Sequence, residues 1–462
     1  MNTRHDVAPP SGAARELGME IAGRLGRVLA AARRAEYYAG ILPRDAAGLD
    51  ALACLPVTTQ KAYHDVMMTA PESLKSGEEH GGIVLQTGGT SGEPKFSIYS
   101  GAEIREMIRS GARMLGLMGV RKEHHVANCL GIGELYGGLI TLEHELLELG
   151  ARSLPFGPHV EPGFFLNAAR RMRVDVLFTN PLFFMHKLRE IHEVDPSFGF
   201  ELLLYGGAGL SRVDAAWIRT HMGVKRIASV IASVDAMQFG FQCPHCTGNE
   251  HHTLDDFNHV EIVDEDGNPV EDGEEGRIVL TSLYRTLYPL IRYDIGDRGR
   301  FIGEACACGS PYRKIEFLGR GGELLSLSEE AEIWVHQLVK AFADEGPSAV
   351  QLVLEPYKHN AHLVVRLEGG HLDGAVVRRK ILERLPVLGE AVERGSILVS
   401  VDVLAPGALP RSHRTGKVRL VVDQRFKGAR APSPLGEPGP WWRGGDDGAA
   451  ALPGVRQAGH RS

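Results

Sequence analysis

Thr87-Gly88-Gly89-Thr90-Ser91-Gly92-Glu93-Pro94-Lys95 is the most informative segment of the sequence. Three glycines let the backbone approach a ligand closely, hydroxyl groups add donors, and Lys95 adds a positive charge. The run lies between a predicted strand at 82–86 and a predicted helix at 104–117, a placement that suits a nucleotide triphosphate. Glu93 and Pro94 stand where the Walker pattern needs Gly and Lys, so this is a phosphate loop of another kind. The alternative is a flexible Gly/Ser turn.

Alternating strands and helices are predicted from about residue 80 to residue 240. The runs at 174–179 and 202–205 are apolar enough for buried strands, which favours a layered α/β fold. Residues 260–263 and 277–280 predict an antiparallel hairpin. Upstream, an amphipathic helix is predicted over 15–38, and Thr58 or Thr59 is suited to cap another helix.

The domain plan follows from changes in composition along the chain. We expect a large N-terminal α/β domain over 15–318 and a small mobile α+β lid domain over 319–425, joined at the glycines near Gly319. Residues 1–14 and 426–462 are expected to be disordered. Within the lid the predicted elements are a helix at 329–343, strands at 348–355 and 361–367, a helix at 373–385 and a strand at 397–404.

Composition excludes several classes of protein. The 462 residues carry 51 Lys and Arg against 58 Asp and Glu, a net charge of −7, which disfavours a nucleic-acid binder. The sequence has neither an apolar run of the roughly 18 residues of a membrane span nor a signal-peptide core. We therefore expect a cytoplasmic protein without membrane or nucleic-acid partners. Whether it forms a homodimer is left open.

Further motifs follow the phosphate loop in order. Residues 87–95 resemble the phosphate loop of the adenylate-forming superfamily, which includes acyl-CoA synthetases, peptide-synthetase adenylation domains and luciferases. Other stretches are similar to the adenine loop (205–209), the ribose motif (288–297), the hinge (317–320) and the C-terminal lysine loop (409–425). Leu55-Pro56-Val57-Thr58-Thr59-Gln60-Lys61 is typical of the branch that contains phenylacetate–coenzyme A ligase. The resemblance spans roughly 50–425.

The resemblance implies a role for each motif. A carboxylate attacks the α-phosphate of ATP, and a second nucleophile then displaces AMP, so catalysis depends on positioning and charge neutralisation. Asp297 would bind the ribose hydroxyls, Arg320 the ribose or phosphate, and Lys417 the α-phosphate and substrate carboxylate. Lys95 joins Lys417 and Asp235 as a candidate catalytic residue. The other residues expected to bind the nucleotide are Thr87, Gly88, Gly89, Thr90, Ser91, Gly92, Gly207 and Ala208.

Two acidic positions of the family differ in this chain. The glutamate that holds magnesium corresponds to Asp235, which is one methylene shorter and would coordinate Mg²⁺ directly or through water. A plain helix-start aspartate is the alternative. The adenine loop has Ala208 where the family often has glutamate.

Four of the six cysteines form two close pairs, Cys243 with Cys246 and Cys306 with Cys308. With the histidines at 251 and 252 they supply the donors of a structural zinc site. The preferred ligands are Cys243, His252, Cys306 and Cys308, with Cys246 as the main substitute. Buried free cysteines and a redox pair are the alternatives. The resembling branch often has a similar Cys/His arrangement.

The acyl pocket is expected near the adenine loop. Tyr136, Gly137, Phe183 and Tyr205 supply aromatic walls and small floors, as an apolar ligand needs, although aromatic residues are also common in cores. The expected function is ATP-dependent adenylation of an aromatic acid and transfer to coenzyme A. The basic residues available for its diphosphate are Arg285, Arg298, Arg300 and Arg313. The alternatives are nitrite activation with aryl-amine diazotisation, amide formation, carrier-protein loading, and nucleotide binding without turnover.

Overall fold

The structure is a computed structural model. It describes residues 12–44, 46–78, 81–86, 96–133, 135–210, 212–320, 324–328, 331–358, 360–411 and 418–425. The chain divides into two compact units, Met1–Gln424 and Arg425–Ser462, and every described helix and strand belongs to the first. Among the described residues, none of the helices is long and apolar enough to cross a membrane.

Eleven strands form the main sheet, in the order β10-β11-β12-β13-β9-β8-β7-β6-β5-β3-β4. The parallel strands are β3 (His125–Cys129), β4 (Arg152–Pro155), β5 (Val176–Thr179), β6 (Leu202–Gly206) and β7 (Arg226–Ser233). The antiparallel strands are β8 (Met237–Phe241), β9 (Glu250–Thr253), β10 (Asn258–Val263), β11 (Gly276–Ser282), β12 (Tyr293–Ile302) and β13 (Lys314–Arg320). Strands and helices in this arrangement confirm the predicted α/β class.

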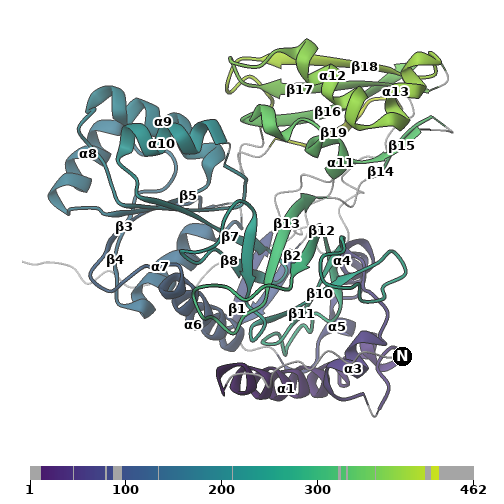
Figure 1. Ribbon diagram of the computed structural model, residues 1–462. Helices are drawn as coiled ribbons and strands as arrows, with labels where there is room; N and C mark the ends of the chain where they lie inside the picture. Colours follow the sequence, from purple (N-terminus) through teal and green to yellow (C-terminus); the bar gives the residue numbers. More distant parts are fainter. Residues whose placement is uncertain are drawn as a thin grey trace, which may run out of the picture. The chain divides into compact units, whose positions relative to one another are not determined.

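Helices cover both faces of the parallel part of the sheet (Figure 1). One face carries α6 (Gly101–Leu117) and α7 (Gly138–Leu149), and the other carries α8 (Pro162–Arg171), α9 (Pro181–Val194) and α10 (Arg212–Met222). Leu204 of β6 packs in the first layer and its neighbour Leu203 in the second, because successive strand residues point to opposite faces. Burial on both faces explains why β5 and β6 are continuous apolar runs.

The strand predicted at 82–86 is confirmed as β1 (Gly82–Gln86), but its partner was not predicted. β1 pairs antiparallel with β2 (Phe96–Ser100), which precedes α6. Residues 87–95 therefore connect two antiparallel strands rather than a strand and a helix. Only Ser97 and Tyr99 of β2 are buried, so a short strand of mixed polarity gave little signal in the sequence. Ser100 then caps α6 in a capping box with Glu103.

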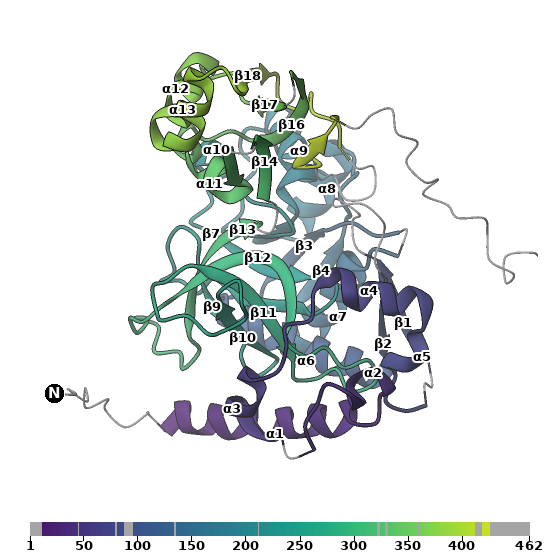
Figure 2. The same ribbon diagram turned by 90° about the vertical axis from the view of Figure 1, so that its right-hand side faces the viewer.

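The N-terminal helices lie before β1 (Figure 2). They are α1 (Gly12–Ala32), α2 (Glu36–Ala39), α3 (Gly48–Ala53), α4 (Gln60–Thr69) and α5 (Pro71–Leu74). The single helix predicted over 15–38 is thus two helices, because Ala35 has an extended backbone. The first begins at Gly12, inside the segment expected to be disordered. The predicted start of α4 is confirmed, since the Thr59 side chain accepts a hydrogen bond from the Ala62 N–H.

The predicted hairpin is confirmed. Val260 of β10 lies opposite Leu280 of β11, and Ile262 lies opposite Ile278. Gly267, in the connection, has a φ of +90°, which glycine adopts readily. β11 continues to β12 and β12 to β13, so the ribose motif lies within the antiparallel half of the main sheet.

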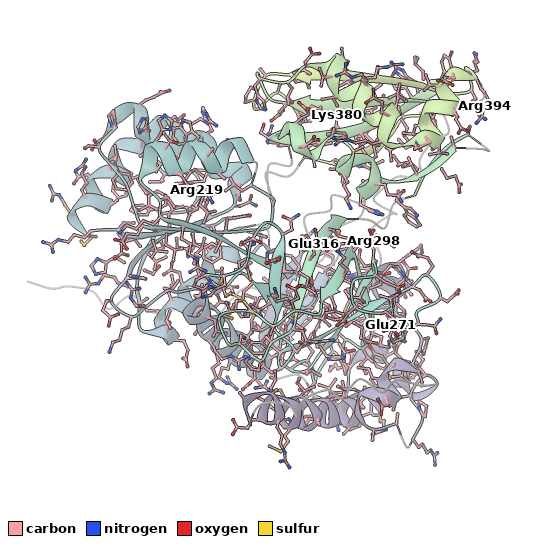
Figure 3. The ribbon with its side chains drawn as sticks, in the orientation of Figure 1. Arg219, Glu271, Arg298, Glu316, Lys380 and Arg394 are labelled. Atoms are coloured by element: carbon pink, nitrogen blue, oxygen red, sulfur yellow. The ribbon has the colours of Figure 1, made fainter. Side chains whose placement is uncertain are left out.

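The C-terminal elements form a four-stranded sheet, β18-β17-β16-β19, and a two-stranded one, β14-β15, around one core. They are β14 (Leu324–Ser328), β15 (Ala331–Trp334), α11 (Val335–Lys340), the 3₁₀ helix Ala343–Glu345, β16 (Ala349–Tyr357), β17 (Asn360–Glu368), α12 (Gly374–Arg384), α13 (Pro386–Glu393), β18 (Leu398–Leu404) and β19 (Val421–Asp423). Most predicted elements are confirmed. The helix predicted over 329–343 is wrong in its first half, where Ala331 and Ile333 alternate inward as strand residues. Lys380 ties α12 to Asp344 at 2.7 Å (Figure 3).

Candidate functional site

Two predicted loops lie outside the described residues. They are the phosphate loop (residues 87–95, with Thr87, Gly88, Gly89, Thr90, Ser91, Gly92 and Lys95) and residues 412–417, with Lys417. The roles given to these residues stay predictions. Their described neighbours show where they attach: Gln86 ends β1, Phe96 begins β2, and Arg411 bridges Val418.

The predicted ribose carboxylate lies on the longest strand of the main sheet. Asp297 is half-buried on β12 and pairs with Arg320 of β13. The structure describes the backbone of Arg320 but not its side chain. The strand is fixed from the N-terminal side, because the Gln60 side chain on α4 donates a hydrogen bond to the Ile295 carbonyl. The segment typical of the ligase branch therefore contacts the strand of the ribose motif.

The adenine-loop residues follow the carboxyl end of β6. Gly207 has a φ of +79°, and a Cβ built on it would lie 3.1 Å from the Asn180 amide nitrogen. Asn180 is buried directly after β5, the neighbour of β6. Ala208 is half-buried beside them. The ends of two adjacent parallel strands thus form a tight corner, where ligands commonly bind in α/β sheets.

The predicted acyl-pocket residues Tyr136 and Gly137 lie beside the strand that leads into the phosphate loop. The Gln86 N–H donates to the Leu135 carbonyl at 3.0 Å. A Cβ on Gly137 would come within 2.9 Å of the end of the Leu85 side chain, so the two segments pack closely together. Burial raises the pKa of Tyr136. This part of the predicted pocket therefore lies beside the end of β1, the last described strand before residues 87–95.

Tyr205 begins a hydrogen-bond chain that the sequence did not indicate. It pairs in register with Ser229 on β7 and hydrogen-bonds to it. The Ser229 hydroxyl lies 2.6 Å from His251 Nε2, and His251 Nδ1 lies 2.8 Å from the Asn249 carbonyl, which only accepts. Nδ1 therefore carries the proton and Nε2 accepts from Ser229. The side chain of Phe183, the fourth predicted pocket residue, is outside the description.

Asp235 lies at the centre of a buried polar cluster. Its side chain accepts hydrogen bonds from the Ser97 hydroxyl at 2.5 Å and the Tyr293 hydroxyl at 2.6 Å. His64 Nε2 lies 3.3 Å from the same carboxylate and 3.2 Å from the Tyr293 oxygen. Arg285 donates to the Asp235 backbone carbonyl at 2.7 Å. Asp235 is 3% exposed, and each of its oxygens has a partner.

The partners of Asp235 determine its charge. Burial by itself raises the pKa of a carboxyl group, but His64, Ser97 and Tyr293 outweigh burial and hold the pKa of Asp235 below its ordinary value. The side chain is therefore a carboxylate at neutral pH. The magnesium role predicted for it stays a prediction, while the contacts that the structure shows are internal.

The cysteine and histidine residues converge as the spacing predicts. Cys243, His252, Cys306 and Cys308 each place one ligand atom within 4.8 Å of all the others. The sulfurs of Cys243 and Cys306 are 3.6 Å apart, and the Cys308 sulfur is 3.3 Å from His252 Nε2. Cys246 has its sulfur 3.6 Å from Cys243 but lies outside this set of four.

Backbone contacts prepare the four residues to bind a metal. His252 Nδ1 is 2.9 Å from the Tyr312 carbonyl, so it carries the proton and leaves the Nε2 lone pair directed toward the cluster. Two backbone N–H groups donate to sulfur, that of His245 to Cys243 and that of Ser310 to Cys308. Such bonds favour thiolates, the form of cysteine that binds metals. The donor set suits Zn²⁺.

Known proteins resemble the chain along most of its length. No family model matches it. It is 25% identical to the phenylacetate–coenzyme A ligase of Thermus thermophilus over 425 residues, which cover 85% of this chain and 92% of that protein. The Escherichia coli K12 enzyme of the same name is 24% identical over 85% of this chain and 90% of its own length. Along most of its length the chain is similar to phenylacetate–coenzyme A ligases.

Solved structures show which fold the chain shares. The structure of 2-hydroxyisobutyryl-CoA ligase in the postadenylation state matches with a TM-score of 0.69 and 19% identity over 91% of this chain and 94% of that one. O-succinylbenzoate coenzyme A synthetase from Bacillus subtilis, bound to ATP and magnesium, matches with a TM-score of 0.53 and 15% identity over 73% and 68%. The adenylate-forming fold is confirmed, and the relatives support an ATP-dependent, AMP-forming ligase.

The arginines expected to bind the coenzyme A diphosphate have other partners in the structure. Arg285 is fully buried and donates to backbone carbonyls, so it is unsuited to the predicted role. Arg313 pairs with Asp255 at 2.6 Å. The other two also have acidic partners: Arg298 of β12 pairs with Glu265, and Arg300 pairs with Glu316 of β13 (Figure 3).

Proposed function

We propose that this chain adenylates an aromatic carboxylic acid with ATP and transfers the acyl group to coenzyme A. The observation that carries the proposal is the match to phenylacetate–coenzyme A ligases along 85% of the chain. The described geometry is consistent with it, because Tyr136 and Gly137 lie beside the strand entering the phosphate loop. An apolar wall next to a phosphate site suits an aryl acid whose carboxylate must reach phosphorus.

Each predicted residue has a defined task in this reaction. The acid carboxylate attacks the α-phosphorus of ATP, pyrophosphate leaves, and a thiol then displaces AMP from the acyl adenylate. Asp297 binds the ribose hydroxyls, and Gly207 lets the adenine approach the end of β6. Lys417 and the phosphate loop neutralise charge at phosphorus, and magnesium accompanies the ATP phosphates. The 319–425 lid would deliver Lys417 and exclude water.

The direct test is pyrophosphate release from ATP over a panel of aryl acids, each with and without coenzyme A. The proposal expects release with at least one aryl acid and acceleration by coenzyme A. Release that is unaffected by coenzyme A would point to another acceptor, such as an amine or a carrier-protein thiol. A chain that binds ATP but releases no pyrophosphate with any acid would contradict the proposal.

Replacing the predicted catalytic lysine tests the role of the C-terminal loop. Lys417→Ala should lower the rate of pyrophosphate release by about 10²- to 10³-fold, because it removes a charge that stabilises the transition state. ATP binding should persist, since other residues hold the nucleotide. Lys225→Ala is the control, because Lys225 is an exposed lysine paired with Glu201. Equal turnover by both variants would show that the role given to Lys417 is wrong.

Nitrite activation is a second candidate, favoured by the changes at two acidic positions. Ala208 replaces a glutamate of the adenine loop, and Asp235 is directed inward. The same assay tests this candidate by adding nitrite to the panel. Pyrophosphate release with nitrite, and with no aryl acid, would replace the aryl-acid proposal.

We further propose that Cys243, His252, Cys306 and Cys308 bind one structural zinc ion. The support is the convergence of four soft ligand atoms within 4.8 Å and the tautomer that the Tyr312 carbonyl imposes on His252. A bound zinc would join the end of β8 to β9 and to the segment before β13, which contributes to folding rather than chemistry. Elemental analysis should find about one zinc per chain. A fully folded preparation without metal would contradict this proposal.

A further inference from the structure

Three segments from distant parts of the sequence meet at one carboxylate. Asp235 follows β7, and its partners are His64 on α4, Ser97 on β2 and Tyr293 on β12. All four residues are at least nine-tenths buried. Each of the two hydroxyls donates to a different carboxylate oxygen, so the side chain joins β2 on one side to β12 on the other.

The two strands joined in this way lead to different parts of the nucleotide site. β2 begins at Phe96, directly after the predicted phosphate loop. β12 carries Tyr293, and Asp297, the predicted ribose ligand, follows four residues later on the same strand. ATP must contact both at once. Any change in the spacing between β2 and β12 therefore changes how well one ATP molecule can satisfy both.

The contacts of Asp235 compete with metal binding. A carboxylate that binds Mg²⁺ directly must direct a free lone pair at the ion, within an octahedral shell at about 2.0–2.1 Å. Here Oδ1 accepts from Ser97 and faces His64, while Oδ2 accepts from Tyr293. Charge-assisted hydrogen bonds of this kind are short and strong, so breaking them to reach a metal is costly.

We propose that Asp235 is an internal positioning residue that fixes the spacing between the phosphate-loop strand and the ribose strand, and that it is not a magnesium ligand. We call Asp235 with its partners Ser97, Tyr293 and His64 the joint between β2 and β12. His64 completes this joint, because its Nε2 approaches both the carboxylate and the Tyr293 oxygen and holds them together. The inference rests on the proposed function only in requiring that the chain binds ATP. It is independent of the acid and of the acceptor.

The test compares ATP with two fragments, adenosine and magnesium tripolyphosphate, by calorimetric or competition binding. Each fragment contacts only one of the joined strands and does not depend on their spacing, whereas ATP gains from engaging both together. Asp235→Asn replaces one carboxylate oxygen by an NH₂ group, so one of the two hydroxyl groups, of Ser97 or Tyr293, loses its acceptor. It should weaken ATP binding about tenfold, as expected for losing a hydrogen bond to a charged group. Binding of each fragment should change less than about twofold, because its own contacts stay.

Other outcomes overturn the joint in distinguishable ways. Weaker binding of magnesium tripolyphosphate, with a higher magnesium concentration for half-saturation, would show that Asp235 is a metal ligand after all. Parallel losses for ATP and both fragments would show general structural damage. Unchanged ATP affinity would show that the joint has no role in positioning. If the unaltered chain binds no ATP, the proposed function fails together with the joint.

Milder variants test the same joint without removing the carboxylate. Tyr293→Phe cuts only the link to β12, and Ser97→Ala cuts only the link to β2. Each variant should weaken ATP binding. Combining either of them with Asp235→Asn should weaken ATP binding little further, because each change interrupts the same connection between β2 and β12. Fully additive losses would contradict the joint. Asp65→Asn is the matched control, since Asp65 is an exposed carboxylate on the same helix as His64.

Discussion

Two polar clusters adjoin the two ends of β8, and they are built on opposite plans: Asp235 precedes the strand and Cys243 follows it. Around Asp235, hydroxyl and imidazole donors surround one carboxylate, so its negative charge is already satisfied by the protein. In the Cys/His cluster, acceptor atoms face one another: three sulfurs and the unprotonated nitrogen of His252. In the first cluster both carboxylate oxygens have partners, whereas the second has the donor set that the proposed zinc ion would complete. The balance of donors and acceptors thus distinguishes an internally paired carboxylate from a candidate metal site.

The largest effect is expected when one ligand of the Cys/His cluster is removed. Cys306→Ser should lose the metal and lower the free energy of unfolding by about 3 kcal/mol or more, because a structural metal contributes binding energy to folding. Elemental analysis and guanidinium unfolding measure the two effects. Retention of a full equivalent of zinc would show that Cys306 is not a ligand.

Another buried carboxyl group, that of Glu145, lacks the partners that surround Asp235. Glu145 on α7 is buried, and its contact with the Gln238 amide is 3.3 Å long. Burial raises the pKa of Glu145 to about 8 from 4.5, despite that hydrogen bond. The folded chain therefore holds the proton more tightly than the unfolded chain, so this stabilisation is complete below about pH 4.5 and is lost as the pH rises through about 8.

Glu145→Gln should remove this pH dependence. The amide stays neutral, so the stability of the variant should fall less than that of the unaltered chain between about pH 5 and pH 9. Guanidinium unfolding at several pH values measures the difference. Parallel curves for the two proteins would mean that Glu145 is not held neutral.

A smaller effect is expected at the edge of the Asp235 cluster. Ser97→Ala should lower the free energy of unfolding by about 1–2 kcal/mol, because a buried carboxylate loses one of its donors while Tyr293 and His64 stay. Zinc content should be unchanged, which distinguishes this cluster from the other. Loss of metal in this variant would show that the clusters are coupled.

The smallest effect is expected at the fourth sulfur, that of Cys246, which lies outside the set of four ligands. Cys246→Ser should keep about one zinc per chain and change the free energy of unfolding by less than about 0.5 kcal/mol, because the other four residues complete a tetrahedral set. Elemental analysis of this variant beside Cys306→Ser makes the comparison directly. A loss of metal equal to that of Cys306→Ser would place Cys246 in the site.

The two clusters also differ in how far the sequence predicted them. Cysteines two or three residues apart are a local pattern, so the sequence already favoured these four ligands with Cys246 as the substitute, and the coordinates show that the four converge. The partners of Asp235 lie on segments up to 171 residues away, at His64, and carry no shared local pattern. Strands with strong apolar runs or a clear turn, such as β6 and the β10–β11 hairpin, were likewise predictable. β2 was not, because its burial depends on β1 and on Asp235.

The proposed zinc site affects how the short strand β9 pairs with its neighbours during folding. Its adjacent residues His251 and His252 point to opposite faces, one toward Ser229 and the other toward the sulfurs. A slip of one residue against β8 or β13 would exchange them, leaving Ser229 without its acceptor and presenting the wrong imidazole to the cysteines. A four-residue strand forms few hydrogen bonds, and these specify its register only weakly. Zinc binding would thus favour the native register of β9 in the sheet, since only the correctly aligned chain can complete the coordination shell.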